Sequence, residues 1–174
     1  MSTLTVQNIQ GSSSSSNTIN VASGHKITGA AGSIAAPGQV LQVVQQQSNT
    51  VFSTTSTSYV DTGFAASITP KFSSSKIYVI AGLNIYNNAT NGVSSTTLYR
   101  GGSRISDSAT YGHAYGFSNA GAHVHHTTFT YLDSPNTTSS TEYKIYISCV
   151  TNGGTLKLCV NNSSSTLTLM EIAQ

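Results

Sequence analysis

Charged side chains are scarce in this sequence. Only 7% of its 174 residues are Asp, Glu, Lys or Arg, against about 25% in ordinary soluble proteins. Five acidic residues leave little material for carboxylate chemistry, and a net charge of +2 provides no basic footprint for nucleic acid. Serine, threonine, asparagine and glutamine supply the polarity instead. Such a surface suits many copies packed close together, because it carries no long-range electrostatic field.

Catalytic motifs are also missing. The chain has no G-x-S-x-G elbow, P-loop, H-E-x-x-H or C-x-x-C. Asp107 and Asp133 would form a glycosidase pair only if the fold brought them together. Both lie beside turns, where a short carboxylate usually caps the backbone. We therefore expect a protein that is not an enzyme.

Long apolar runs are absent as well. No segment approaches 18 apolar residues, and no apolar run follows a basic N-terminal region. The sequence therefore predicts neither membrane insertion nor a secretory signal.

Short runs rich in valine, isoleucine, tyrosine and threonine alternate with glycine, asparagine and serine clusters. Without helical apolar spacing, this pattern predicts an all-β protein of nine or ten short strands, an antiparallel β-sandwich or jelly roll. The run at 76–86 is apolar on both faces, which predicts a central strand or one at a subunit interface.

The first 36 residues differ from residues 37–174, which we take as the head domain. They are either a disordered tail or an extended arm that becomes ordered against other subunits. Their regularly spaced aliphatic residues favour the arm: Val6, Ile9, Ile19, Val21, Ile27 and Ile34.

Two glycine turns predict hairpins. Gly101-Gly102 would pair Leu98 with Ile105 on one face and Tyr99 with Arg104 on the other. Asn152-Gly153 would join 141–149 to 155–160, with Cys149 opposite Leu156 and Ile147 opposite Leu158.

That second register places Cys149 and Cys159 on opposite faces, where they cannot form a disulfide bond. We therefore expect two free thiols, one of them buried, and assembly in a reducing compartment. In the last strand, 165–174, Glu171 shares a face with Leu167 and Leu169. We expect its carboxylate to meet solvent or a basic partner.

The segment 109–133 is the richest in aromatic and imidazole residues. Tyr111, His113 and Tyr115 alternate along one run, and His123 and His125 alternate along the next. We expect two antiparallel strands with these residues on matching faces. Two imidazoles are too few for a stable transition-metal site, but a three-fold axis would supply six. The alternatives for the histidines are interface packing without metal, or simple exposure.

Residues near the first glycine turn are candidates for binding a partner. Arginine can hold an anionic sugar or phosphate, although Arg104 can equally stack on Tyr99 in a solvated hairpin. Aromatic rings with polar handles are typical of surfaces that bind proteins or sugars. The receptor-binding candidates are Tyr99, Arg100, Arg104, Tyr111, His113 and Tyr115.

Four stretches resemble a known family in their order: PGQVLQVVQ (37–45), LYRGGSRI (98–105), YLDSPNTTSSTEYKIYIS (131–148) and STLTLMEIAQ (165–174). This order is similar to the head domains of tail fibre-like and other virion structural proteins of tailed phages, particularly marine ones. The arrangement also resembles the trimeric jelly roll of the complement globular-head and tumour-necrosis-factor class.

The resemblance implies a homotrimeric virion protein, assembled in the bacterial cytoplasm, whose residues 1–36 attach to other virion proteins. A short arm favours a short tail fibre or fibre-tip subunit that binds a host cell-surface glycan or protein. The alternative is a capsid decoration or cement protein. We expect no cofactor, apart from a transition metal that His123 and His125 would hold if their strand lay on a three-fold axis.

Overall fold

The computed structural model describes residues 19, 21–29, 34–105, 111–118, 121–150 and 154–174. Every regular element among them is a β-strand, which confirms the all-β prediction. No helix in this part of the chain is long and apolar enough to cross a membrane. The strands are β1 (Val40–Ser48), β2 (Phe52–Thr54), β3 (Val60–Ile68), β4 (Lys76–Asn87), β5 (Gly92–Arg100), β6 (Ser103–Arg104), β7 (Ala114–Ser118), β8 (His123–Asp133), β9 (Thr141–Cys149), β10 (Leu156–Leu158) and β11 (Ser165–Ile172).

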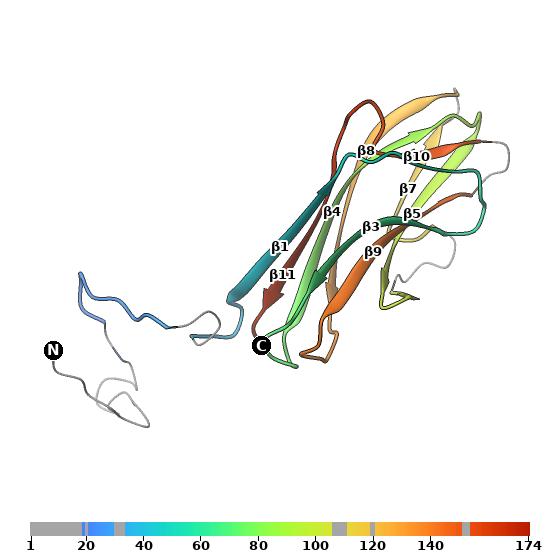
Figure 1. Cartoon of the computed structure of the whole chain (residues 1–174). Coiled ribbons are helices and arrows are strands. Elements are labelled where there is room, and N and C mark those ends of the chain that lie inside the picture. The colour runs from blue at the N-terminus through green and yellow to red at the C-terminus, as the bar shows by residue number, and fades with distance from the viewer. Residues whose placement is uncertain (1–18, 20, 30–33, 106–110, 119–120, 151–153) are drawn as a thin grey trace. The chain divides into compact units, whose positions relative to one another are not determined.

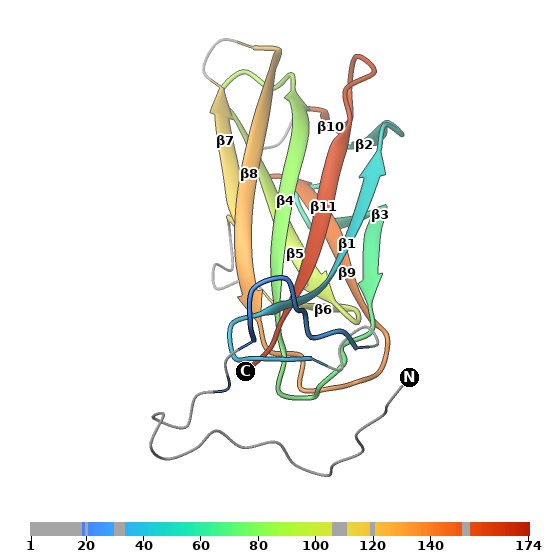
Figure 2. The same ribbon diagram turned by 90° about the vertical axis from the view of Figure 1, so that its left-hand side faces the viewer.

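The strands form two antiparallel sheets (Figure 1). The first sheet has the order β1-β11-β4-β10-β2, and β8 pairs with β4 along its other edge. The second has the order β3-β9-β5-β6, and β7 also pairs with β5. Figure 2 shows β8, β4, β11 and β1 side by side, with β5 and β9 behind them. This arrangement is consistent with a β-sandwich.

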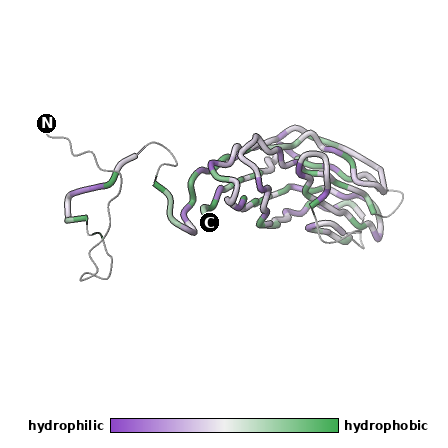
Figure 3. Tube along the Cα trace, turned by 90° about the horizontal axis from the view of Figure 1, so that it is seen from below, coloured by the Kyte–Doolittle hydropathy of each residue, from purple (hydrophilic) through white to green (hydrophobic). Residues whose placement is uncertain are grey.

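One apolar core lies between the sheets, and alternation along the strands builds it. In β9, for example, Tyr143, Ile145 and Ile147 are fully buried while Lys144 and Tyr146 face outward. Hydrophobic and hydrophilic residues follow one another at short intervals along the tube in Figure 3. Each large aliphatic side chain that is fully buried in this way contributes about 1.5–3 kcal/mol.

Strand β4 has partners along both edges. Strand β8 pairs with it from Ile77 to Asn87, β11 pairs with its first half, and β10 with its last three residues. Between β11 and β10, the buried Asn84 accepts the Cys159 N–H at its backbone oxygen (3.0 Å) and the Val160 N–H at Oδ1 (2.9 Å). The prediction of a central strand is therefore confirmed.

The Gly101-Gly102 hairpin is also confirmed. Both glycines have positive φ, 53° and 84°, and Tyr99 pairs with Arg104. The Ile105 N–H donates to the Leu98 carbonyl oxygen at 3.1 Å. The two-residue loop suits glycine, because side chains rarely adopt positive φ at two successive positions.

The predicted hairpin between 141–149 and 155–160 is wrong. Strand β9 pairs with β3 and β5 in the second sheet, whereas β10 pairs with β4 and β2 in the first. The turn residues 151–153 lie outside the described part. Both strands do present their apolar residues to the core, but from opposite sheets. An apolar face shows which side meets the core, and it does not show which sheet the strand joins.

Both cysteines are free, as expected. Cys149 and Cys159 are both fully buried, so the expectation that only one is buried is wrong. Cys159 lies in a turn with positive φ (59°), and its thiol lies 3.2 Å from the Ser48 carbonyl oxygen and 3.2 Å from the Ser165 hydroxyl.

Asp133 is not a solvated turn cap but the acceptor of an inward-facing cluster. The Arg100 Nη1 atom donates to both of its carboxylate oxygens at 2.7 Å, and the Tyr143 hydroxyl donates at 2.6 Å. This cluster ties β8 of the first sheet to β5 and β9 of the second. Asp107 lies outside the described residues.

Glu171 meets neither solvent nor a basic partner, contrary to expectation. Its side chain is fully buried and accepts Gln42 Nε2 at 2.6 Å and the backbone N–H groups of Lys71 and Phe72 at 2.6 and 3.4 Å. Burial raises the pKa of the carboxyl group, but the Ser75 hydroxyl and these three donors lower it more. The pKa therefore lies below its ordinary value.

The chain divides into two units, Met1–Ile34 and Ala35–Gln174. In the first, the described residues belong to no strand or helix, and a turn joins the His25 N–H to the Ala22 carbonyl oxygen at 3.0 Å. Its described aliphatic side chains are exposed: Ile19, Val21, Ile27 and Ile34.

The Tyr143→Phe variant removes one hydrogen bond to a buried carboxylate. We expect the free energy of unfolding to fall by about 1.5–3 kcal/mol, the range for hydrogen bonds to charged groups. Urea denaturation measures this. Tyr78→Phe is the matched control, because the half-buried Tyr78 hydroxyl has no hydrogen bond among the described residues. Equal losses in the two variants would contradict the cluster's role.

The Glu171→Gln variant tests the buried carboxylate. Because its pKa is lowered in the folded state, the charge stabilises the fold above the ordinary glutamate pKa, and this stabilisation is lost as the pH falls through the folded value. The variant's amide N–H₂ would face N–H donors, so we expect a loss of about 1.5–3 kcal/mol near pH 7 and a flatter acid limb. Urea midpoints at about pH 6 and 3.5, with the exposed Glu142→Gln as control, measure it. A Glu171→Gln variant whose urea midpoint falls with decreasing pH as steeply as that of the wild type would contradict this account.

Candidate recognition face

The outward side of the second sheet collects polar aromatic residues from five segments. The strand register brings these residues together on one side of the sheet. On β5, Ser95 and Tyr99 point outward, and Tyr115 of β7 pairs with Ser95 while Lys144 of β9 pairs with Tyr99. We call this surface the tyrosine face. Its aromatic members are Tyr59, Tyr99, Tyr111, Tyr115, Phe117 and Tyr146.

Ring contacts order part of the tyrosine face. Tyr99 stacks on Tyr146 with ring centroids 3.7 Å apart and an interplanar angle of 19°. The Tyr111 and Tyr115 rings are 5.1 Å apart and tilted by 38°. Such rings offer a large contact area at little conformational cost, because only two side-chain torsions need to be fixed.

Two cations lie on the tyrosine face. The Arg104 guanidinium carbon is 5.4 Å from the Tyr59 ring centroid, whereas the sequence suggested stacking on Tyr99. Lys144 Nζ lies 3.1 Å from Asp61 Oδ2 and 3.3 Å from Glu142 Oε1, and hydrogen bonds to these two carboxylates raise its pKa. Among the described residues of the face, two cations and two carboxylates balance, so this part of it suits a partner of low net charge.

Of the six receptor-binding candidates, four lie on this face: Tyr99, Arg104, Tyr111 and Tyr115. Tyr111, Tyr115 and Phe117 are 46%, 64% and 58% exposed, so the most exposed rings of the face lie on β7 and just before it. Tyr59 and Tyr146 were missed. The period-two alternation of Tyr146 with Ile145 and Ile147 was the available signal.

Arg100 and His113 lie elsewhere. Arg100 points inward to Asp133. The His113 ring packs against Phe129 at 4.8 Å and Tyr131 at 5.1 Å, and its Nδ1 accepts the Leu98 N–H at 3.2 Å. The side-chain alternation breaks just before β7, where Gly112 has a φ of 60°.

Tyr111–Phe117 and His123–Tyr131 do not form the predicted antiparallel pair. Strand β7 pairs with β5 and β8 with β4, so the two runs belong to different sheets. They meet across the core instead: a Cβ atom at Gly116 would lie 2.5 Å from His125 Nε2, which leaves room only for glycine.

His123 and His125 point to this inner side, which the buried Phe129 also occupies. Their rings stack at 5.1 Å with an angle of 11°, and His125 Nδ1 is buried without a hydrogen-bond partner in the described residues. The outward-facing His126 has Nε2 3.5 Å from Asn84 Nδ2. No group of three or more histidine, cysteine, aspartate or glutamate residues suited to a metal ion occurs in the described ranges. A metal on a three-fold axis stays a prediction.

Burial, then the neighbouring charges of His123 and His126, lowers the pKa of His125. The pair lies beneath β7, whose outer side carries Tyr115 and Phe117. Proton uptake at His125 is therefore coupled to the packing of the strand that presents the tyrosine face.

The chain matches no protein-family model, and no curated protein matches it.

A pH titration of stability tests the histidine pair. A folded-state pKa below the ordinary value of about 6.5 means that the fold favours neutral His125. This stabilisation is present above that pH and is lost as the pH falls through the folded pKa. We expect the wild-type urea midpoint to fall between about pH 7.5 and 5, and to fall less in His125→Gln. The exposed His25→Gln, in the N-terminal unit, is the control. Identical pH profiles in all three proteins would refute the coupling.

Proposed function

We propose that this chain is a non-enzymatic structural protein of a tailed-phage virion: a subunit of a short tail fibre or fibre tip that attaches to the host cell surface. The observation that carries the proposal is the contrast between its two outer faces. The first sheet presents an apolar row, which suits association with further copies of the chain. The second presents the tyrosine face, which suits recognition of a partner outside the assembly.

The apolar row crosses four strands in register. Val43 pairs with Met170, Met170 with Tyr78, and Tyr78 with Leu132. Val43 and Leu132 are 55% and 50% exposed. Contiguous exposed apolar side chains are a feature of interaction sites. The proposed occupant is a second copy of this chain, and three copies arranged around an axis form the homotrimer.

Strand pairing supports a jelly roll. The eight longer strands pair as β1–β11, β3–β9, β4–β8 and β5–β7. First pairs with last, second with next-to-last, and so on inward, which is the order obtained when one long hairpin folds into two sheets. This order fits the resemblance to trimeric jelly-roll heads, and the first sheet is then the one that faces the axis.

The N-terminal residues complete the proposal. Residues 1–36 would attach the head to other virion proteins, and the exposed Ile19, Val21, Ile27 and Ile34 supply apolar contacts for that purpose. The same residues favour the second candidate, a capsid decoration protein whose arm crosses neighbouring subunits. Copy number separates the two: quantitative mass spectrometry of the particle gives tens of copies for a tail fibre and hundreds for a shell protein.

Sedimentation equilibrium of the full chain tests the self-association. We expect a mass three times that of the 18.1 kDa chain, and monomers for Val43→Asp/Leu132→Asp, because a trimer interface would bury both carboxylates. Tyr115→Asp, on the tyrosine face, is the matched control and should remain trimeric while losing adhesion to host cells. A monomeric wild-type chain would contradict the proposal.

A further inference from the structure

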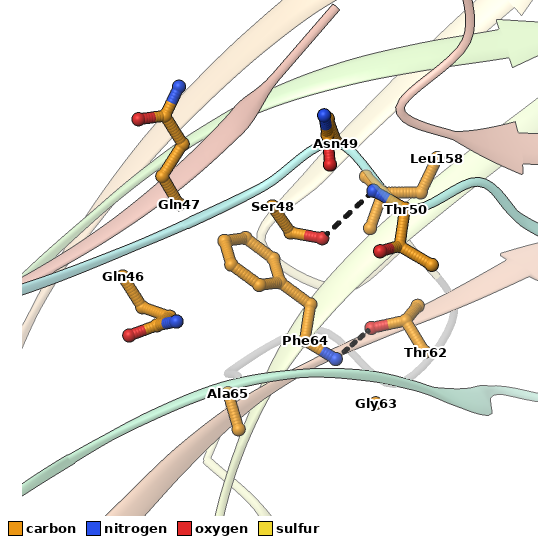
Figure 4. Close-up of a pocket in the computed structure, with 10 residues that line it drawn as sticks. All are labelled: Gln46, Gln47, Ser48, Asn49, Thr50, Thr62, Gly63, Phe64, Ala65 and Leu158. Carbon is orange, nitrogen blue, oxygen red and sulfur yellow. Dashed lines mark hydrogen bonds between the residues drawn. The ribbon is translucent and has the colours of Figure 1, made fainter. Parts of the chain in front are cut away.

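A cleft of about 450 Å³ opens between the end of β1 and the start of β3, on neither of the two outer faces described above. Its size falls within the range of small-molecule sites. Figure 4 shows its lining, with the Phe64 ring lying between the two strands. The lining residues are Gln46, Gln47, Ser48, Asn49, Thr50, Thr62, Gly63, Phe64, Ala65 and Leu158.

A bulge in β3 builds one wall. The register passes from Asp61 opposite Tyr146 to Ala65 opposite Lys144, so β3 carries two extra residues there. The Gly63 N–H donates to Asp61 Oδ1 at 2.8 Å, and Gly63 has a φ of 73°. The Thr62 hydroxyl donates to the Ile145 carbonyl oxygen at 2.7 Å and so fixes the bulge to β9.

The end of β1 builds the other wall. The Ser48 carbonyl oxygen lies 3.2 Å from the buried Cys159 thiol, and the Ser48 hydroxyl accepts the Thr50 N–H at 3.2 Å (Figure 4). Phe64, only 5% exposed, and Leu158, 1% exposed, close the bottom. Both walls are thus held in place by the fold.

Uncommitted amide groups line this cleft. The exposed side chains of Gln46, Gln47 and Asn49 make no hydrogen bond within the described part of the chain. Figure 4 shows the Gln46 side chain on the Phe64 side of β1, and those of Gln47 and Asn49 on the other side, where a second hollow lies. On the same strand, by contrast, Gln42 donates to Glu171 and Gln45 donates to Thr168.

A second hollow of about 330 Å³ adjoins the first and shares Gln47 and Asn49, with Asn162 and Ser164 on its far side. No charged side chain from the described part of the chain lines either hollow. An ionic ligand would find no counter-charge here. Amide groups donate and accept hydrogen bonds at once, as hydroxyl groups do.

We propose that these two hollows form a binding site for a neutral saccharide, one sugar unit in each hollow. The ligand's hydroxyl groups bond to the side-chain amide of Gln46 in the first hollow and to those of Gln47 and Asn49 in the second. The site is separate from the tyrosine face and does not require the chain to be an attachment protein.

The test uses the ¹⁵N-labelled full chain and three neutral probes, maltotriose, cellotriose and chitotriose, with 3′-sialyllactose as the anionic comparison. We expect at least one neutral probe to shift the amide signals of residues 46–50 and 62–65. Its affinity should stay nearly constant between about 0.05 and 0.5 M NaCl, since no charge pair is screened.

Gln47→Ala/Asn49→Ala removes two uncommitted, exposed amides and should weaken binding about ten-fold or more. Gln45→Ala, on the same strand outside the cleft, should bind as the wild type does. Gln46→Ala provides a second test if the double variant loses its folded spectrum. No shift with any neutral probe, or unchanged affinity in the cleft variants, would overturn the proposal. If a neutral probe shifts the amide signals of a chain that does not adhere to host cells, the saccharide site is supported and only the proposed attachment function is contradicted.

Discussion

The fold depends on one strand that is bonded along both edges. Strand β4 holds β8 on one side and β11 and β10 on the other, and its inner side chains Ile77, Val79, Ala81, Leu83 and Ile85 are almost fully buried. Its outer side carries Tyr78 in the apolar row. The core, the row and the position of the histidine pair on β8 therefore all follow from the register of β4. A one-residue slip would reverse every one of these faces.

Because the sheets share one core, their outer faces are free to differ. Polar links fix how the sheets meet at the end of the sandwich, where Arg100 and Tyr143 from the second sheet bond to Asp133 of the first. The first sheet's outer face carries the apolar row, and that of the second collects tyrosines. Scarcity of charge matters here, because an uncharged surface lets copies approach closely without repulsion.

The sequence was enough to predict turns and which side of a strand faces the core, but not which of the two sheets each strand joins. The Gly101-Gly102 turn and the alternation in β11 correctly predicted register and facing. The pairing of β9 with β10 failed because both inner faces of a two-sheet core require the same apolar alternation. Arg100 and Glu171 were misplaced for a related reason: their partners lie 33 and about 100 or more residues away, beyond any short-range pattern. Gln47 and Asn49 could not be singled out as binding residues from the sequence, because the chain contains many other neutral amide side chains.

Native-state hydrogen exchange tests the central role of β4 most directly. An element bonded along both edges and buried on its inner face should open only when the whole domain unfolds. Its amides should therefore exchange with the free energy of global unfolding, while those of β1, bonded along one edge, exchange through smaller openings. Amides of β4 that exchange as easily as those of β1 would contradict this account.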